Sequence, residues 1–109
     1  MTGVAVGSPM VQEEIFGPVV NIIPFDTLEE AASLANRTDY GLTAQVWTRD
    51  IRRAHRLVDA LDVGSVWVNG KSMDIALPFG GFKESGWGQE KGREGVELYT
   101  RLKTVVMSL

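Results

Sequence analysis

The sequence predicts an α/β fold whose first part is a parallel βαβαβ segment, followed by a glycine-rich loop, a helix and a C-terminal strand. Short runs rich in β-branched residues alternate with amphipathic stretches in which apolar residues recur at helical spacing. Each amphipathic stretch begins at a residue suited to capping a helix, Thr27 in the first and Asp50 in the second. Crossovers of this length join parallel strands through right-handed connections.

The first strand and helix are expected after an irregular start. Residues 1–12 carry little pattern, and Gly17-Pro18 marks a turn. The run from Val19 to Phe25 is nearly continuously apolar, which suits a strand buried on both faces. In Thr27-Leu-Glu-Glu30 the threonine oxygen can accept a hydrogen bond from the amide of Glu30 while the glutamate side chain reaches back. This capping box starts a helix that should end near Asn36-Arg37.

The second crossover unit leads from a strand at Leu42–Thr48 to a strand at Ser65–Asn69. Between them, Asp50 caps a helix, and Gly64 is the expected residue in left-handed conformation just past its end. The apolar face of this helix consists of Ile51, Ala54, Leu57, Val58 and Leu61.

The last third of the chain does not continue the alternation of predicted strands and helices. Residues 70–79 predict an irregular loop, and residues 80–95 contain six of the 12 glycines, which favours tight turns there. A helix is expected from about Arg93 to Tyr99. The final run, Leu102–Leu109, predicts a strand with apolar residues on both sides.

Such a sheet is incomplete. Two crossover helices on one side cover one face, whereas parallel strands need cover on both. The last strand has no obvious partner, and open edges of this kind pair with other chains. Two interpretations stay open at this point: a part or protomer of something larger, and a small complete α/β domain whose last strand adds antiparallel to the sheet.

Composition excludes several classes of function. The chain has 109 residues, a net charge of −3 and no cysteine. The mild acidity predicts neither nucleic-acid nor membrane binding. Without cysteine, these residues supply no disulfide, thiolate metal site or thiol nucleophile. The start lacks the basic and apolar regions of a signal peptide, so a cytoplasmic protein is expected.

Most candidate motifs are better explained as structural features than as catalytic or binding sites. Gly86-Trp-Gly88 opens like a dinucleotide fingerprint, but Lys91 stands where the third glycine belongs. His55 has no second ligand at helical spacing, so no metal site is predicted. Glu13-Glu14 differs, because Phe16 follows closely: a carboxylate can accept from a sugar diol and an aromatic ring can flank a heterocycle. Alone, this pattern is also that of a charged loop.

Five motifs together resemble the NAD(P)-dependent aldehyde dehydrogenases, in the order and near the spacing of that family. The likeness runs from about Met10 to the last residue and covers only the C-terminal part of such an enzyme. The motifs are Glu13-Glu-Ile-Phe-Gly-Pro-Val19, Tyr40-Gly-Leu-Thr-Ala44, Gly64-Ser-Val-Trp-Val-Asn69, Pro78-Phe-Gly-Gly-Phe-Lys-Glu-Ser-Gly86 and Leu98-Tyr-Thr-Arg-Leu-Lys-Thr104.

The resemblance implies a division into residues 1–85, the end of the catalytic domain, residues 86–100, a glycine-rich connection and helix, and residues 101–109, an oligomerisation strand. It implies oxidation of an aldehyde to an acid with NAD or NADP. In the family a cysteine thiolate attacks the aldehyde and a glutamate activates water. Both groups are expected outside these residues, so the chain alone should be inactive.

Individual residues carry over from the family's motifs. Glu14 resembles the glutamate that binds the nicotinamide-side ribose hydroxyls, and Phe16 resembles the aromatic residue beside that end of the cofactor. Asn69 resembles the asparagine that follows the third strand. Leu102–Leu109 resembles the strand that pairs between subunits of a homo-oligomer. The loop at the aldehyde entrance suggests four candidate substrate contacts, Met73, Asp74, Ile75 and Phe79.

Two other functions remain compatible with the sequence. The same fold could serve as a non-catalytic module that binds a full-length relative or itself, which predicts a stable dimer or a defined partner. It could also be one half of a split enzyme, with the nucleophile on a separate chain.

Overall fold

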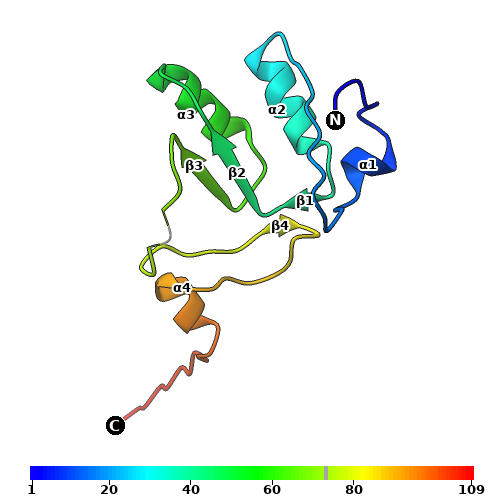
Figure 1. Cartoon of the computed structure of the whole chain (residues 1–109). Coiled ribbons are helices and arrows are strands. Elements are labelled where there is room, and N and C mark those ends of the chain that lie inside the picture. The colour runs from blue at the N-terminus through cyan, green and yellow to red at the C-terminus, as the bar shows by residue number, and fades with distance from the viewer. Residues whose placement is uncertain (73) are drawn as a thin grey trace.

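The computed structural model describes residues 1–72 and 74–109. Figure 1 shows a parallel strand–helix–strand unit with a second helix beside it, and a C-terminal part that projects away. In chain order the elements are α1 (Pro9–Gln12), α2 (Leu28–Asn36), β1 (Tyr40–Gly41), β2 (Thr43–Val46), α3 (Ile51–Ala60), β3 (Ser65–Val68), β4 (Phe82–Lys83) and α4 (Gly92–Glu97).

The unit β2–α3–β3 confirms the predicted parallel crossover. Its two strands pair in register from Thr43 opposite Ser65 to Val46 opposite Val68. The helix between them begins because Asp50 Oδ1 accepts a hydrogen bond from the backbone N–H of Arg52 at 2.9 Å.

Helix α2 is also confirmed, with Thr27 as its cap and a Glu30 side chain that reaches back one residue beyond the cap, to Asp26. Thr27 Oγ1 accepts from the N–H of Glu30 at 3.1 Å, and Glu30 Oε2 accepts from the N–H of Asp26 at 2.8 Å. The buried apolar side chains among the described residues are Ala32, Val46 and Ala54, which come from α2, β2 and α3. The core therefore lies where the two helices meet the β2–β3 pair, and it consists of small side chains.

The predicted first strand, Val19–Phe25, is wrong. Only Ile22 forms a bridge, with Thr2, in which the Ile22 N–H donates to the Met1 carbonyl at 2.8 Å. Phe25 remains 54% exposed. A strand exists only where neighbouring backbone pairs with it, and the described residues offer this segment no ladder. The parallel sheet consequently contains β2 and β3 alone.

One strand pairing and one short helix escape the sequence patterns. Strands β1 and β4 form a short antiparallel ladder in which Tyr40 is opposite Lys83 and Gly41 is opposite Phe82. Helix α1 begins with Pro9 at its first position, inside the stretch expected to be irregular.

Gly64 has a different role from the expected one. Helix α3 ends at Ala60, and the backbone of the capping residue Leu61 is already extended, so Gly64 is not the residue just past its end. A Cβ atom on Gly64 would lie 1.7 Å from the carbonyl oxygen of Gly80. Glycine is needed here because another stretch of backbone approaches closely.

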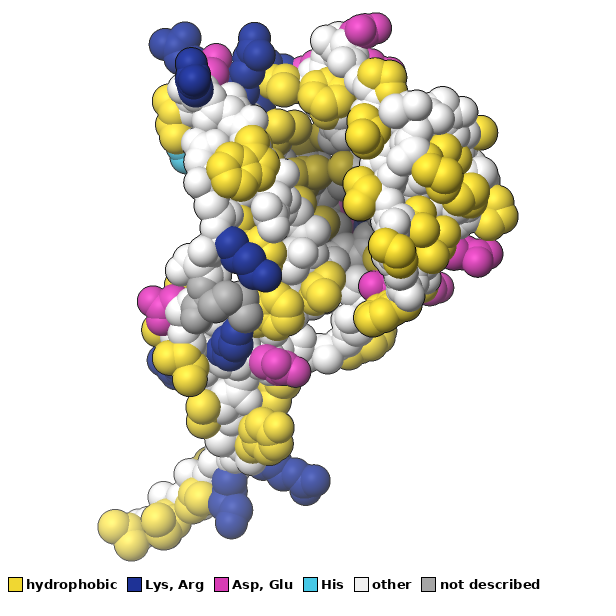
Figure 2. All heavy atoms as spheres, viewed as in Figure 1, with side chains coloured by type: hydrophobic (Ala, Val, Ile, Leu, Met, Phe, Trp, Pro, Cys, Tyr) yellow, Lys and Arg dark blue, Asp and Glu magenta, His cyan; other side chains and the backbone are white. Residues whose placement is uncertain are grey.

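The C-terminal segment is not a strand in this chain. The expected helix is present as α4, but residues 101–109 form no backbone hydrogen bond with any described residue. Figure 2 shows apolar side chains along the projecting end, where Leu102, Val106 and Met107 are exposed. Within the described ranges, no helix is long and apolar enough to cross a lipid bilayer.

Candidate functional site

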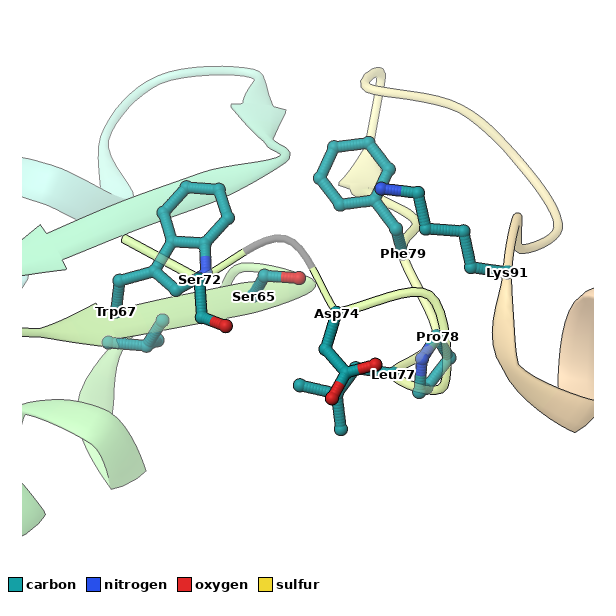
Figure 3. Close-up of a pocket in the computed structure, with 9 residues that line it drawn as sticks. Ser65, Trp67, Ser72, Asp74, Leu77, Pro78, Phe79 and Lys91 are labelled. Atoms are coloured by element: carbon teal, nitrogen blue, oxygen red, sulfur yellow. The ribbon is translucent and has the colours of Figure 1, made fainter. Parts of the chain in front are cut away.

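A cavity of about 250 Å³ opens between β3, the loop that follows it and the residue before α4 (Figure 3). Both aromatic and polar side chains line it. The lining residues are Ser65, Val66, Trp67, Ser72, Asp74, Leu77, Pro78, Phe79 and Lys91.

Strand β3 supplies one wall and a fixed starting point for the loop. Trp67 lies on this strand and is partly buried. Just past the strand, Asn69 adopts a left-handed φ of 55°. Its carboxamide forms two hydrogen bonds with the backbone of Thr48, at 2.8 Å and 2.7 Å. The loop therefore leaves β3 from a position that is tied to the end of β2.

The far end of the loop is held by backbone pairing. Phe79 and Glu90 exchange two N–H···O=C bonds of 2.7 Å each. The N–H of Gly92 donates to the carbonyl of Ile75 at 2.9 Å. Within the loop, Asp74 Oδ1 accepts from the N–H of Ala76 at 2.9 Å. The aspartate carboxylate thus stabilises the turn that brings Phe79 to the cavity.

Two lysines lie over the aromatic rings of the site. Lys91 Nζ is 5.3 Å from the centroid of the Phe79 ring, and Lys71 Nζ is 5.6 Å from the centroid of the Trp67 ring. Both are within the range of cation–π attraction. No ion pair in the described part of the chain includes either lysine. Of the two, Lys91 lines the cavity, and Lys71 contacts the ring of a lining residue.

The structure places the predicted substrate residues unevenly. Asp74 and Phe79 line the cavity, whereas Ile75 is 79% exposed and does not. Met73 lies outside the described residues. Sequence patterns did not single out Lys91 as a functional residue. Its φ of 62° and its contact with Phe79 depend on tertiary structure and leave no local sequence signal.

The predicted cofactor residues lie elsewhere. Glu14 and Phe16 come shortly after α1 in the chain, and Figure 1 shows α1 on the side of the molecule away from the loop after β3. Both are exposed, Phe16 at 97%, and no hydrogen bond or ion pair between described residues joins them to the cavity. An exposed carboxylate with an exposed ring two residues away can still accept from a diol and flank a heterocycle. The described residues contain no group of three His, Cys, Asp or Glu side chains that could hold a metal ion.

Comparison with known proteins identifies relatives along nearly the whole chain. The aldehyde dehydrogenase family profile matches residues 1–105. The 2-hydroxymuconic semialdehyde dehydrogenase of Pseudomonas putida is 48% identical over 109 residues, which are 99% of this chain and 22% of that protein. The 4-trimethylaminobutyraldehyde dehydrogenase of Homo sapiens is 50% identical over 100 residues, 91% of this chain and 20% of that protein. The chain spans about a fifth of the length of these relatives.

Solved structures agree with these sequence matches. The Mycobacterium tuberculosis aldehyde dehydrogenase in complex with NAD+ superposes with a TM-score of 0.93 at 42% identity, over 98% of this chain and 22% of that one. The Pseudomonas syringae indole-3-acetaldehyde dehydrogenase in complex with NAD+ and IAA also gives 0.93, at 48% identity, over 99% of this chain and 22% of that one. The α/β fold is therefore that of these enzymes, and the chain belongs to the aldehyde dehydrogenase family.

Proposed function

We propose that these residues complete the cofactor site and the substrate pocket of an NAD(P)-dependent aldehyde dehydrogenase that oxidises an aldehyde to a carboxylic acid. The observation that carries the proposal is the family match over residues 1–105, since solved relatives of the same fold hold NAD+. The loop from residue 70 to residue 79 would border the aldehyde, with Asp74 and Phe79 on the wall of the cavity.

The residues after α1 fit a role at the nicotinamide end of the cofactor. When bound, the cofactor supplies the hydride acceptor. The Glu14 carboxylate would accept hydrogen bonds from ribose hydroxyls, which orients that sugar. The Phe16 ring, 97% exposed in this chain, would pack beside the nicotinamide. Both side chains are accessible, as this role requires.

The nucleophile must come from elsewhere in the enzyme. The 109 residues contain no cysteine, so they offer no thiolate to attack an aldehyde carbon. We therefore expect a polypeptide of these residues alone to produce no NADH from an aldehyde.

We also propose that Leu102–Leu109 pairs with a sheet of a second subunit, because its apolar side chains are exposed and its backbone is unpaired within the described chain.

A joined enzyme tests the proposal. In it, the 100 residues of this chain that match the human 4-trimethylaminobutyraldehyde dehydrogenase replace the corresponding segment of that enzyme. With butanal and NAD+, we expect NADH formation by the joined enzyme and none by the 109-residue chain. Turnover by the 109-residue chain, or a folded joined enzyme without activity on butanal, would contradict the proposal.

Glu14→Gln in the joined enzyme tests the cofactor role separately. Loss of the charged acceptor should raise the KM for NAD+ about tenfold, because a hydrogen bond to a charged group is worth about 1.5–3 kcal/mol. The neighbouring Glu13→Gln is the matched control and should leave KM unchanged. Equal kinetics for the two variants would remove Glu14 from the cofactor site.

A further inference from the structure

We propose that Asn69 is a site of spontaneous deamidation, and that its conversion to aspartate or isoaspartate releases the loop after β3 from the end of β2. The reaction makes Asn69 a slow, irreversible switch on the loop that lines the cavity. Water is the only co-reactant. This inference goes beyond the proposed function and does not depend on it.

The reaction begins inside the chain itself. The backbone nitrogen of the residue after an asparagine attacks the carboxamide carbon Cγ, and a bond between these two atoms forms. The bond from Cγ to Nδ2 breaks, and ammonia leaves with the proton of the attacking amide. Water then opens the cyclic imide at one of its two carbonyl groups, which gives an aspartate or, with the main chain rerouted through Cγ, an isoaspartate. No electrons are gained or lost.

Gly70 is well suited to this attack on Asn69. It has no side chain to hinder ring closure, and nothing lies within 4 Å of the position that its Cβ would occupy. The N–H of Gly70 donates no hydrogen bond to any described residue, so its proton is available to solvent. Asn69 is itself exposed, which admits the water consumed in the second step.

The other two asparagines lack these features. Asn21 is followed by Ile22 and Asn36 by Arg37, and both following residues carry a side chain that crowds the attacking nitrogen. Their N–H groups are also engaged, since each donates to a backbone carbonyl, at 2.8 Å from Ile22 and at 3.3 Å from Arg37. The structure therefore singles out Asn69 among the three asparagines of the chain.

The native fold slows the reaction at Asn69. Its Oδ1 accepts from the Thr48 N–H at 2.8 Å, and its Nδ2 donates to the Thr48 carbonyl at 2.7 Å. The carboxamide must leave both hydrogen bonds before it can turn toward the Gly70 nitrogen. The reaction thus proceeds from locally opened conformers, and its rate reports how often the pair opens.

The product cannot restore the pair. An aspartate at position 69 keeps an acceptor for the Thr48 N–H but has no donor for the Thr48 carbonyl, so a carboxylate oxygen is left facing a carbonyl oxygen. An isoaspartate also lengthens the main chain between β3 and the loop by one methylene group. Either product weakens the tie between the loop and the end of β2.

Peptide mapping of aged protein tests the site. The folded 109-residue chain would be kept at mildly alkaline pH in water enriched in heavy oxygen and then digested in ordinary water. We expect label at Asn69 and none at Asn21 or Asn36. Gly70→Ala, for which the structure has space, should slow the reaction about tenfold, which corresponds to about 1.4 kcal/mol in the activation free energy. The chain unfolded in urea should react faster than the folded chain.

Three results of this mapping would overturn the proposal. These are no conversion of Asn69 in the folded chain, equal conversion at Asn21 or Asn36, and an unchanged rate in Gly70→Ala. Equal rates in the folded and unfolded chains would overturn the restraint by Thr48.

Tryptic cleavage tests the release of the loop. Cleavage after Lys71 should be about tenfold faster in the aged chain and in Asn69→Asp than in the fresh chain, because cleavage follows local opening and a hydrogen bond has been lost. Cleavage after Lys103, in the C-terminal segment without backbone pairing to described residues, is the internal control and should not change. An unchanged rate at Lys71 in chains that contain the converted residue would overturn the release. Neither measurement requires turnover, so failure of the joined enzyme on butanal leaves both outcomes readable.

Discussion

The carboxamide of Asn69 forms a reciprocal pair with the backbone of Thr48, accepting from its N–H at 2.8 Å and donating to its carbonyl at 2.7 Å. The two residues follow β3 and β2, so the pair extends the parallel ladder by a side chain where the backbones begin to diverge. The loop that lines the cavity starts at the next residue. The carboxamide therefore helps to fix the start of the loop, together with the Asn69 N–H, which donates to the Val46 carbonyl at 2.8 Å.

Loss of the pair should destabilise the protein. Asn69→Gly keeps access to the φ of 55° but removes both hydrogen bonds, and we expect a loss of about 1–3 kcal/mol in the free energy of unfolding. Asn69→Ala should lose about 1 kcal/mol more, because alanine resists the left-handed conformation. Urea unfolding followed by circular dichroism measures both. Equal stability of Asn69→Ala and the unmodified chain would show that the pair has no structural role.

Gly64→Ala should be among the most damaging single changes in the chain. The new Cβ would lie 1.7 Å from the Gly80 carbonyl oxygen and 3.2 Å from the Gly81 Cα, and these backbone atoms cannot move aside as a flexible side chain could. We expect a loss of about 3 kcal/mol or more. Gly70→Ala is the matched control, because nothing lies within 4 Å of a Cβ there. A thermal melt of the two variants should separate them clearly, and similar midpoints would contradict the close contact.

Helix α2 should depend on the cap at Thr27. Thr27→Ala removes the acceptor for the Glu30 amide and should cost about 1 kcal/mol of stability, whereas Thr27→Ser keeps the hydroxyl and should cost much less. Amide hydrogen exchange at Glu30 measures the effect locally. Exchange at the same rate in Thr27→Ala and Thr27→Ser would rule out a contribution from the cap.

The C-terminal segment should drive self-association. Val105→Asp together with Met107→Asp places charges on exposed apolar positions of residues 101–109, and we expect the oligomer to dissociate into monomers. Light scattering coupled to gel filtration gives the mass. Arg52→Asp on α3 is the control for a change of surface charge. A monomeric unmodified chain, or no loss of mass in the double variant, would argue against an oligomerisation strand.

Elements fixed by local contacts could be predicted from the sequence. Helices α2 and α3 begin where Thr27 and Asp50 predict, because a cap joins groups only two or three residues apart. Val19–Phe25 and Leu102–Leu109 have the composition of strands yet form none here. Composition makes a segment suitable for a sheet, but a strand also needs a neighbour, and that requirement is not local.

The candidate site also combines residues that the sequence could predict with a residue that it could not. Asp74 and Phe79 could be named from a motif, and both line the cavity. Lys91 could not be named, since its effect depends on a ring twelve residues earlier in the chain that is brought close by the Phe79–Glu90 pairing. No spacing rule relates these two positions.

The sequence by itself determined the family, the parallel unit β2–α3–β3 and the absence of a thiol nucleophile within these residues. Those properties follow from residue identity, capping and apolar spacing, which act over a few positions. Only the tertiary structure decided which stretches pair as strands, why Gly64 must be glycine, and where Lys71 and Lys91 place positive charge. These depend on distances between residues far apart in the chain, which packing sets and a linear pattern does not encode.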